Sequence, residues 1–412
     1  MKQALRIGLY LIMILLVLEV IKTILVKAGA LYSFSIGVVI ASLQMLLVFT
    51  AVLVPLLFKV FKKRTLHARK ALRLSFLSFF LIIACFEGLC TLLMHNAERL
   101  PVFLRNTFEF YYNTYARSIV QFKSEAAVYD PQLFYTLKPN ARFRFVNAEF
   151  NTAYSVNRLG LRDDDSSLNK PAIISIGDSY GMGWGVEQDS TYSQQLEVLS
   201  HQKVLNTAIS SYGTAREITS LHRFDTSAIK YLVIQYCEND VEENTDYINN
   251  NHVLKISSRQ VYDKSVKLEK ATSTYYPGKH FLNIFQLFVK QQVNKVAHVF
   301  PFTAGNFGDE VTAASQAGLF LKVLGDAPVD FARCKVIVLF PGKDFGRSRA
   351  FETALNSILQ TPSVITRFSN NIKVLKVSEL LQPNDYYIMD IHLRNSGHRK
   401  IAEALWNMMQ TF

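Results

Sequence analysis

The chain has 412 residues, of which 50% are hydrophobic, and it carries a formal net charge of +12 at pH 7. Most of the charge is N-terminal: residues 1–95 hold 11 Lys and Arg against 2 Asp and Glu, whereas the remainder holds 34 against 31. The basicity therefore gives no footprint for nucleic acid, and we exclude a nucleic-acid partner.

Three apolar stretches occupy the first quarter of the chain, at residues 7–26, 31–58 and 72–94. Each is long enough to cross about 30 Å of hydrocarbon as a helix, so we predict three N-terminal transmembrane helices in contact with a lipid bilayer. The alternative for the first stretch is a signal peptide, because Ala28-Gly29-Ala30 resembles a cleavage site.

The basic residues predict how these helices are oriented. Lys2 and Arg6 precede the first stretch, and the connection between the second and third contains no acidic residue. Its basic residues are Lys59, Lys62, Lys63, Arg64, Arg69, Lys70 and Arg73. The positive-inside rule places the N-terminus in the cytoplasm, at the inner (cytoplasmic) membrane of a bacterium. Everything after Met94 is then periplasmic or extracellular.

Charged residues within the apolar stretches are costly in hydrocarbon and usually face a partner. Glu19 and Lys22 lie one helical turn apart in the first stretch, and Glu87 lies at a similar depth in the third. We predict that these three residues form a polar cluster joining two helices. The cluster has either a structural role or a role in coupling to a membrane donor or partner.

We predict three regions along the chain. Residues 1–95 form the membrane anchor, residues 96–170 a linker with a small β-rich lead-in, and residues 171–412 an α/β domain with an insertion at about 241–332. The insertion contains an amphipathic pattern from Phe281 to Val299, which suits packing on the core, an active-site lid or a surface resting on the membrane.

From Pro171 onwards, short β-branched runs alternate with helical patterns. The runs are Ala172–Ile176, Val204–Asn206, Tyr231–Tyr236, Val336–Phe340 and Val374–Val377, and the helical patterns lie near 190–200, 214–224, 347–360 and 395–410. Such alternation is typical of a parallel sheet with helices on both faces. Ligands bind such sheets beyond the carboxyl ends of the strands.

Polar residues of catalytic type follow several of these predicted strands. Gly177-Asp178-Ser179 follows the first, Asn206-Thr207-Ala208 the second and Glu238-Asn239-Asp240 the third, while Asp390-Ile391-His392 lies near the C-terminus. A serine hydroxyl becomes a good nucleophile only when a base removes its proton. We therefore expect one cleft to gather a nucleophile, an amide donor and an acid–histidine pair.

This ordered set resembles the SGNH/GDSL hydrolase superfamily, from about Pro171 to the C-terminus. The segments Gly160-Leu161-Arg162-Asp163 and Tyr212-Gly213-Thr214 look like a membrane-associated bacterial branch of that superfamily. The resemblance implies a flavodoxin-like sheet. It also implies esterase activity, which in many members acts on O-acylated carbohydrates.

The resemblance also implies roles for individual residues. Ser179 matches the nucleophile, His392 the general base, and Asp390 the carboxylate that fixes the histidine tautomer. The amide of Asn239 and the backbone N–H groups of Ser179 and Ala208 match the oxyanion hole. The chain departs from the usual pattern at Ala208, where the family has glycine, and in the single residue between Asp390 and His392.

Other motifs have competing interpretations. The glycines 181, 183 and 185 could cradle a phosphate, but they lack the lysine and spacing of a P-loop and suit a turn beside Ser179. Residues 163–165 could bind calcium or form an exposed turn. His398 could have a catalytic role or belong to the start of the last helix, which it suits better. Since neither an HExxH nor a CxxC motif occurs, we expect no metal and no cofactor.

The predicted function is therefore a membrane-anchored extracytoplasmic serine esterase or deacetylase. It acts on O-acylated envelope glycans through an acyl-serine intermediate. One alternative is an O-acyltransferase that works with a membrane acyl-donor protein, because three helices are too few to move an acyl donor across a membrane. A second alternative is a non-catalytic glycan-binding or scaffold protein that retains the fold.

Overall fold

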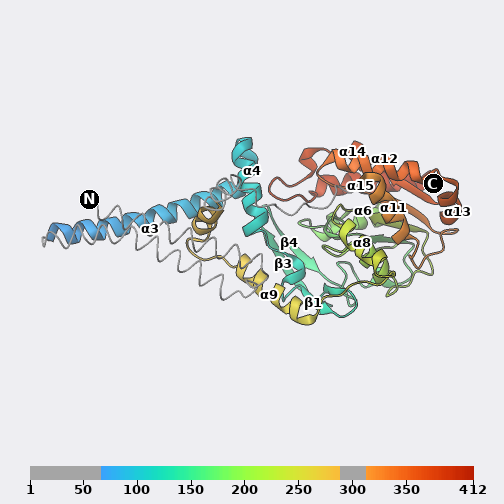
Figure 1. Ribbon diagram of the computed structural model, residues 1–412, viewed down its shortest axis with the longest axis horizontal. Helices are drawn as coiled ribbons and strands as arrows, with labels where there is room; N and C mark the ends of the chain where they lie inside the picture. The colour runs from blue at the N-terminus through green and yellow to red at the C-terminus, as the bar shows by residue number, and fades with distance from the viewer. Residues whose placement is uncertain (1–65, 288–311) are drawn as a thin grey trace. The chain divides into compact units, whose positions relative to one another are not determined.

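The computed structural model describes residues 66–287 and 312–412, which fall into two compact units (Figure 1). Of the described residues, the first unit holds 66–116 and 270–287, and the second holds 117–269 and 312–412. The predicted membrane helices at 7–26 and 31–58 lie outside the described residues, as do Glu19 and Lys22.

The first unit is helical. It contains α3 (Leu66–His95), η1 (Ala97–Arg99), α4 (Val102–Tyr111), the π-helical turn η2 (Tyr112–Ala116) and the helical residues 279–287. Within the described part of the chain, α3 alone is long and apolar enough to cross a membrane, over Leu77–His95. This segment overlaps the third predicted membrane helix at 72–94.

The second unit is built on a five-stranded parallel sheet with the order β6-β5-β7-β8-β9. Its strands are β5 (Ile173–Ile176), β6 (Val204–Asn206), β7 (Tyr231–Gln235), β8 (Lys335–Leu339) and β9 (Ile372–Leu375). In chain order this is the 2-1-3-4-5 arrangement of flavodoxin-like folds, whose ligand site lies where the strand order reverses.

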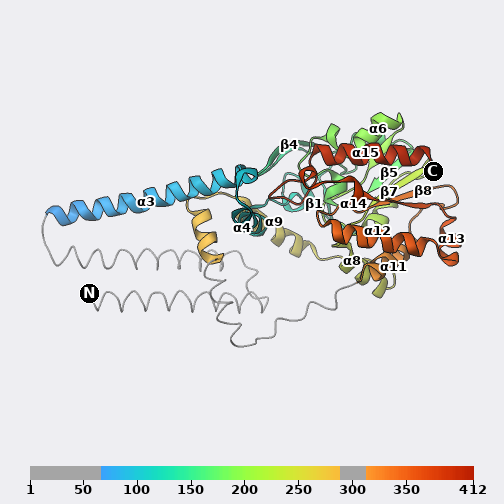
Figure 2. The same cartoon turned by 90° about the horizontal axis from the view of Figure 1, so that it is seen from above.

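Helices cover both faces of the sheet because alternate strand residues point to opposite sides. Ile173, Val233 and Ile337 pack with α6 (Tyr192–Ser200) and α15 (Asn395–Gln410). Their neighbours in the same strands pack with α7 (Thr214–Leu221), α8 (Asp240–Asn249), α11 (Ala313–Leu324) and α12 (Phe345–Leu359). Figure 2 shows α6 and α15 on one side and α8, α11 and α12 on the other. The predicted α/β fold with helices on both faces is confirmed.

Most predicted elements of this unit match the observed ones to within about two residues. The interval between β7 and β8 differs from the prediction, because part of it packs on the sheet. Both α8 and α11 lie within the predicted insertion at 241–332, yet Tyr247 and Phe320 from these helices belong to the sheet core. The remaining helical elements are shorter or peripheral. They are α5 (Ser179–Met182), α9 (Arg259–Ser273), α13 (Pro362–Phe368), α14 (Val377–Leu380), η3 (Val120–Phe122), η4 (Ser166–Leu168), η5 (Gln188–Ser190) and η6 (Pro383–Asp385).

The predicted β-rich lead-in consists of two antiparallel hairpins. One pairs β1 (Ala127–Asp130) with β2 (Phe134–Leu137), and the other pairs β3 (Arg142–Asn147) with β4 (Phe150–Ser155). Phe145 and Tyr154 from the second hairpin pack in one cluster with Met182 and Trp184, which follow the predicted nucleophile. The lead-in thus contributes directly to the surroundings of that residue.

Candidate active site

The predicted nucleophile, Ser179, is the first residue of α5, directly after β5. Asp178 caps this short helix by accepting a hydrogen bond from Tyr180 N–H at 2.9 Å. Gln235, the last residue of β7, accepts hydrogen bonds through Oε1 from the N–H groups of Asp178 (2.9 Å) and Gly181 (3.0 Å). Two adjacent strands therefore fix the turn that presents Ser179.

Gly177 allows this turn to lie close to Gln235. A Cβ atom at position 177 would lie 2.6 Å from Gln235 Oε1 and 2.9 Å from its Cβ. Such contacts are shorter than real side chains tolerate, so the nucleophile turn and the end of β7 can approach only if residue 177 is glycine.

Ser179, His392 and Asp390 form one hydrogen-bonded chain, as predicted from their order in the sequence. His392 Nε2 lies 2.7 Å from Ser179 Oγ, and His392 Nδ1 is hydrogen-bonded to Asp390 Oδ1. Ser179, His392 and Asp390 are 8%, 4% and 0% exposed, respectively. The distance from base to nucleophile is within the range needed for direct proton transfer.

The ionisation of Asp390 fixes the role of each histidine nitrogen. Burial alone would raise the pKa of Asp390, but the charge and hydrogen bond of His392, the charge of Arg117 and a hydrogen bond from Trp184 lower it to about 2. An ionised carboxylate can only accept hydrogen bonds, so Nδ1 of His392 carries a proton. In the neutral imidazole Nε2 is then free to accept the proton of Ser179.

We expect the folded state to lose stability when Asp390 is protonated. Its folded-state pKa of about 2 lies below the ordinary value of 3.8. The stabilisation is therefore complete above pH ~4 and is lost as the pH falls through about 2, with a size of roughly 2 kcal/mol. The thermal midpoint of the wild type should fall over this window, and the midpoint of Asp390→Asn should fall less. Parallel curves for the two proteins would contradict the assignment.

Besides the N–H of Ser179, the predicted oxyanion groups belong to Ala208 and Asn239, which lie beyond the ends of β6 and β7. The N–H of Ala208 donates to Asn206 Oδ1 at 3.1 Å, and a Cβ atom built on Gly181 would lie 2.8 Å from the Ala208 Cβ. Asn239 is exposed at the start of α8 and makes no capping hydrogen bond with its side chain. Their contribution to an oxyanion hole stays a prediction.

Glu149 supports the loop that carries Asp390, although its role was not predicted. It lies in the two-residue turn between β3 and β4, where Asn147 pairs with Phe150. Its carboxylate accepts hydrogen bonds from the backbone N–H groups of Ile388 (2.8 Å), Met389 (2.7 Å) and Asp390 (2.9 Å). The tip of a lead-in hairpin thus fixes the backbone of Asp390, the predicted catalytic acid.

We expect Glu149→Gln to weaken both folding and catalysis. Glutamine has one acceptor oxygen and an NH₂ group, so at least one of the three N–H groups loses its partner, at a cost of about 1–3 kcal/mol. The thermal midpoint and kcat of an ester substrate should both fall. Glu187→Gln is the matched control, because Glu187 is exposed and, among the residues that the structure describes, accepts a hydrogen bond only from Ala153 N–H of the same hairpin. Equal effects of the two substitutions would contradict the special role of Glu149.

The motif Gly160-Leu161-Arg162-Asp163 makes hydrogen bonds to the ends of two elements that carry site residues, α5 and β6. The buried Arg162 guanidinium donates to the carbonyls of Met182 (3.1 Å) and Gly183, at the end of α5, and lies 3.6 Å from the Tyr154 ring centroid. Asp163 Oδ2 accepts from Asn206 N–H at 2.7 Å, which fixes the end of β6. The interpretation of residues 163–165 as an exposed turn is wrong for Asp163, which is buried.

Gly183 and His398 have structural roles in this unit. Gly183 ends α5 in the left-handed region with φ 84°, which suits the predicted turn beside Ser179. His398 lies in the first turn of α15, as predicted, and its Nδ1 accepts from Tyr192 N–H at 3.2 Å. Burial lowers the pKa of His398 to about 3, so it stays neutral.

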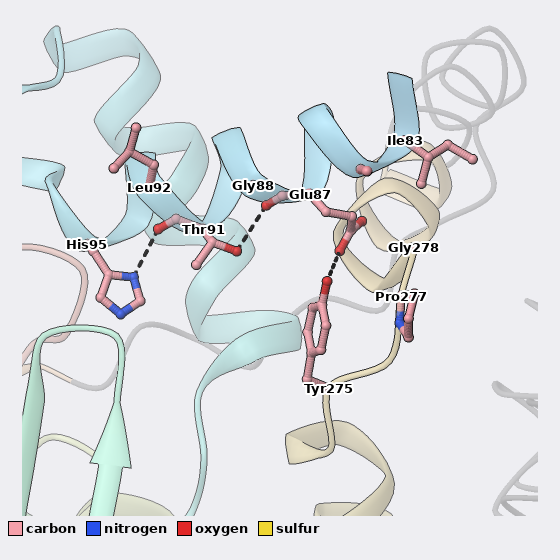
Figure 3. Close-up of a pocket in the computed structure, with 10 residues that line it drawn as sticks. Ile83, Glu87, Gly88, Thr91, Leu92, His95, Tyr275, Pro277 and Gly278 are labelled. Carbon is pink, nitrogen blue, oxygen red and sulfur yellow. Dashed lines mark hydrogen bonds between the residues drawn. The ribbon is translucent and has the colours of Figure 1, made fainter. Parts of the chain in front are cut away.

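In the first unit, Glu87 is buried and has partners among the described residues. Its carboxylate accepts hydrogen bonds from Tyr275 Oη at 3.1 Å and Phe281 N–H at 2.8 Å. Glu87 and Tyr275 line a cavity of about 810 Å³ together with other residues of α3 and with Pro277 and Gly278. Figure 3 shows the lining residues. The predicted pairing with Lys22 falls outside the described residues, so it stays a prediction.

No family model and no curated protein matches the chain. Similar solved structures include a member of the lipolytic protein G-D-S-L family from Veillonella parvula DSM 2008, with 12% identity and a TM-score of 0.30, covering 58% of this chain and 98% of that chain. A lipase from a goat rumen metagenome has 14% identity and a TM-score of 0.29, covering 57% and 94%. The flavodoxin-like strand order and the hydrogen-bonded chain of Ser179, His392 and Asp390 are properties of this chain itself.

Proposed function

We propose that this protein is a membrane-anchored, extracytoplasmic serine esterase that removes acyl groups from O-acylated envelope glycans. The observation that carries the proposal is the continuous hydrogen-bonded chain Ser179–His392–Asp390 at the carboxyl ends of the parallel strands. Nucleophile, base and orienting acid are all present and buried, an arrangement that suits nucleophilic catalysis on an ester.

The reaction follows from the hydrogen bonds. His392 Nε2 takes the proton of Ser179 as Oγ attacks the ester carbonyl, and Asp390 stabilises the imidazolium that forms. The tetrahedral intermediate collapses when His392 returns the proton to the leaving sugar oxygen, which leaves the acyl group on Ser179. Water, deprotonated by His392, then attacks the acyl-serine and releases the carboxylic acid and the free serine.

The substrate and location are supported by sequence features. The basic connection before residue 74 and the apolar segment Leu77–His95 favour a membrane anchor whose following domain faces away from the cytoplasm. O-acylated envelope glycans are among the ester-bearing molecules on that side. The motifs around Ser179 and His392 resemble a superfamily in which many members act on such glycans.

An O-acyltransferase uses the same triad and differs only in the second step. A sugar hydroxyl replaces water as the group that attacks the acyl-serine. Such an enzyme needs an acyl donor delivered from the membrane by a partner protein. A glycan-binding scaffold is the third alternative, and the intact triad argues against it, because binding does not require a serine hydrogen-bonded to a histidine.

The experiment uses the full-length protein in detergent with a nitrophenyl acetate ester and a fluorophosphonate probe. Turnover and covalent labelling at Ser179 are expected, and both should disappear in Ser179→Ala and remain in the control Ser265→Ala on α9. Absence of turnover and labelling in the wild type rejects the enzyme and favours the scaffold. Turnover that rises sharply when an oligosaccharide acceptor is added, with acyl transfer to the sugar, favours the acyltransferase.

A further inference from the structure

Trp184 contacts both partners of the catalytic serine. Its indole N–H donates to Asp390 Oδ2 at 3.1 Å, while His392 is bonded to the other oxygen, Oδ1. The indole ring also stacks on the imidazole of His392, with ring centroids 4.7 Å apart and an interplanar angle of 17°. One side chain thus holds the carboxylate by a hydrogen bond and the imidazole by its face.

The position of Trp184 is fixed by the turn that carries the nucleophile. Its backbone N–H donates to the carbonyl of Ser179 at 3.0 Å. Gly183 and Gly185 on either side adopt φ values of 84° and 80°, which glycine tolerates best. Phe145 packs edge-on against the indole, with centroids 4.7 Å apart, and Trp184 is only 2% exposed. The indole therefore has little freedom to move.

The Asp390 carboxylate and the Trp184 indole together restrict the orientation of the His392 imidazole. Loss of Trp184 would remove the hydrogen bond to Asp390 Oδ2 and the stacking contact on one face of the His392 imidazole. With Trp184 in place, both carboxylate oxygens have a donor, and the stacked indole defines the plane of the ring. The Arg117 guanidinium lies 5.9 Å from the Trp184 ring centroid. Its charge helps to lower the pKa of Asp390. The carboxylate therefore stays ionised and accepts both hydrogen bonds.

We propose that Trp184 is a positioning residue that holds the His392–Asp390 pair in register with Ser179. This inference rests on the proposed hydrolase function of the triad. The competing explanation is that Trp184 only fills the core beside Phe145. The two explanations differ in what they predict for kcat when the shape of the indole is kept and its N–H is removed.

The chain offers a direct way to remove only the N–H. It contains two tryptophans, Trp184 and Trp406, so in a Trp406→Phe background Trp184 is the one remaining tryptophan. Replacing it with 3-benzothienylalanine keeps the bicyclic shape and substitutes sulfur for the N–H. We expect kcat on the nitrophenyl ester to fall about 10- to 100-fold with KM unchanged, because the base is misplaced and binding is not. The kcat of Trp184→Phe should fall by at least the same factor.

Fluorescence of Trp184 supplies a second readout, independent of activity. A protonated imidazole stacked on an indole quenches its emission, so emission in the Trp406→Phe background should change with the protonation of His392. The change should vanish in His392→Gln. The positioning role is overturned if kcat is unchanged in the benzothienylalanine protein. It is also overturned if Trp184 emission responds in the same way with and without the His392→Gln substitution.

Failure of the hydrolase function gives a different pattern of results. In that case Trp406→Phe shows no fluorophosphonate labelling at Ser179, whatever residue occupies position 184. Labelling that is present in Trp406→Phe and slowed by benzothienylalanine supports both the function and the positioning role. Labelling that is present and equally fast in both proteins keeps the function and rejects the positioning role.

Discussion

Replacement of Ser179 by alanine is expected to lower kcat on an ester substrate by about 10⁶-fold, while KM changes little. The expected fall in kcat has this size because the members of a catalytic triad act as a unit, so loss of the nucleophile removes the covalent route entirely. His392→Ala should lower kcat by a similar factor, because Ser179 Oγ, 2.7 Å from Nε2, then has no base. The measurement is single-turnover and steady-state release of nitrophenol.

The double variant gives the sharper test of this interpretation. If Ser179 and His392 serve one proton transfer, the double variant Ser179→Ala/His392→Ala should be no slower than either single variant. Multiplied losses would show that the two residues contribute to separate steps. Residual activity of Ser179→Ala within about tenfold of the wild type would reject Ser179 as the nucleophile. Unchanged thermal midpoints serve as the control for folding.

The sheet of the second unit could be predicted because its strands are short, mostly apolar runs. Ile173 and Ile174 point to opposite faces, and both faces are covered by helices, so neither position is polar. The same burial made the polar residues after the strands conspicuous. Ser179, Asp390 and His392 could be singled out because they follow apolar or aromatic segments, and the resemblance to the SGNH/GDSL superfamily implied their roles.

The supporting residues of the site could not be predicted because their partners are distant in the sequence. Glu149 binds the backbone 239 to 241 residues further along, and nothing in its own neighbourhood signals this contact. Trp184 reaches Asp390 across 206 residues. The one available signal for Trp184 was local: glycines on both sides mark a backbone that is shaped around the side chain.

The lead-in and the interval after β7 show a second reason for incomplete prediction. The lead-in was predicted to be β-rich, but such a prediction gives no information about what the turn between β3 and β4 contacts. Similarly, α8 and α11 lie in a stretch interpreted as an insertion, because the interval between the third and fourth predicted core strands is long. Tyr247 and Phe320 are buried through tertiary packing that the local pattern does not record.

Asp390→Asn is expected to lower kcat by about 10⁴-fold, because an asparagine cannot satisfy both of its neighbours. Oδ1 of Asp390 accepts from His392 and Oδ2 accepts from Trp184, whereas asparagine has one oxygen and one NH₂ group. If the oxygen faces Trp184, the NH₂ group donates to Nδ1 of His392, so Nε2 carries the proton and cannot accept that of Ser179. If the oxygen faces His392, the NH₂ group meets the indole N–H, donor against donor.

Because of this conflict, we expect the effect of Trp184→Phe on kcat to have opposite signs in the wild type and in the Asp390→Asn protein. Trp184→Phe lowers kcat in the wild type, but in the Asp390→Asn protein it removes the competing donor. The introduced asparagine can then turn its oxygen towards Nδ1 of His392 and restore the productive tautomer. We expect Asp390→Asn/Trp184→Phe to recover kcat on the order of tenfold over Asp390→Asn alone, the size of coupling that contacting residues commonly show. A double variant slower than both single variants would contradict competition at position 390, because additive losses require that Trp184 and His392 act on it independently.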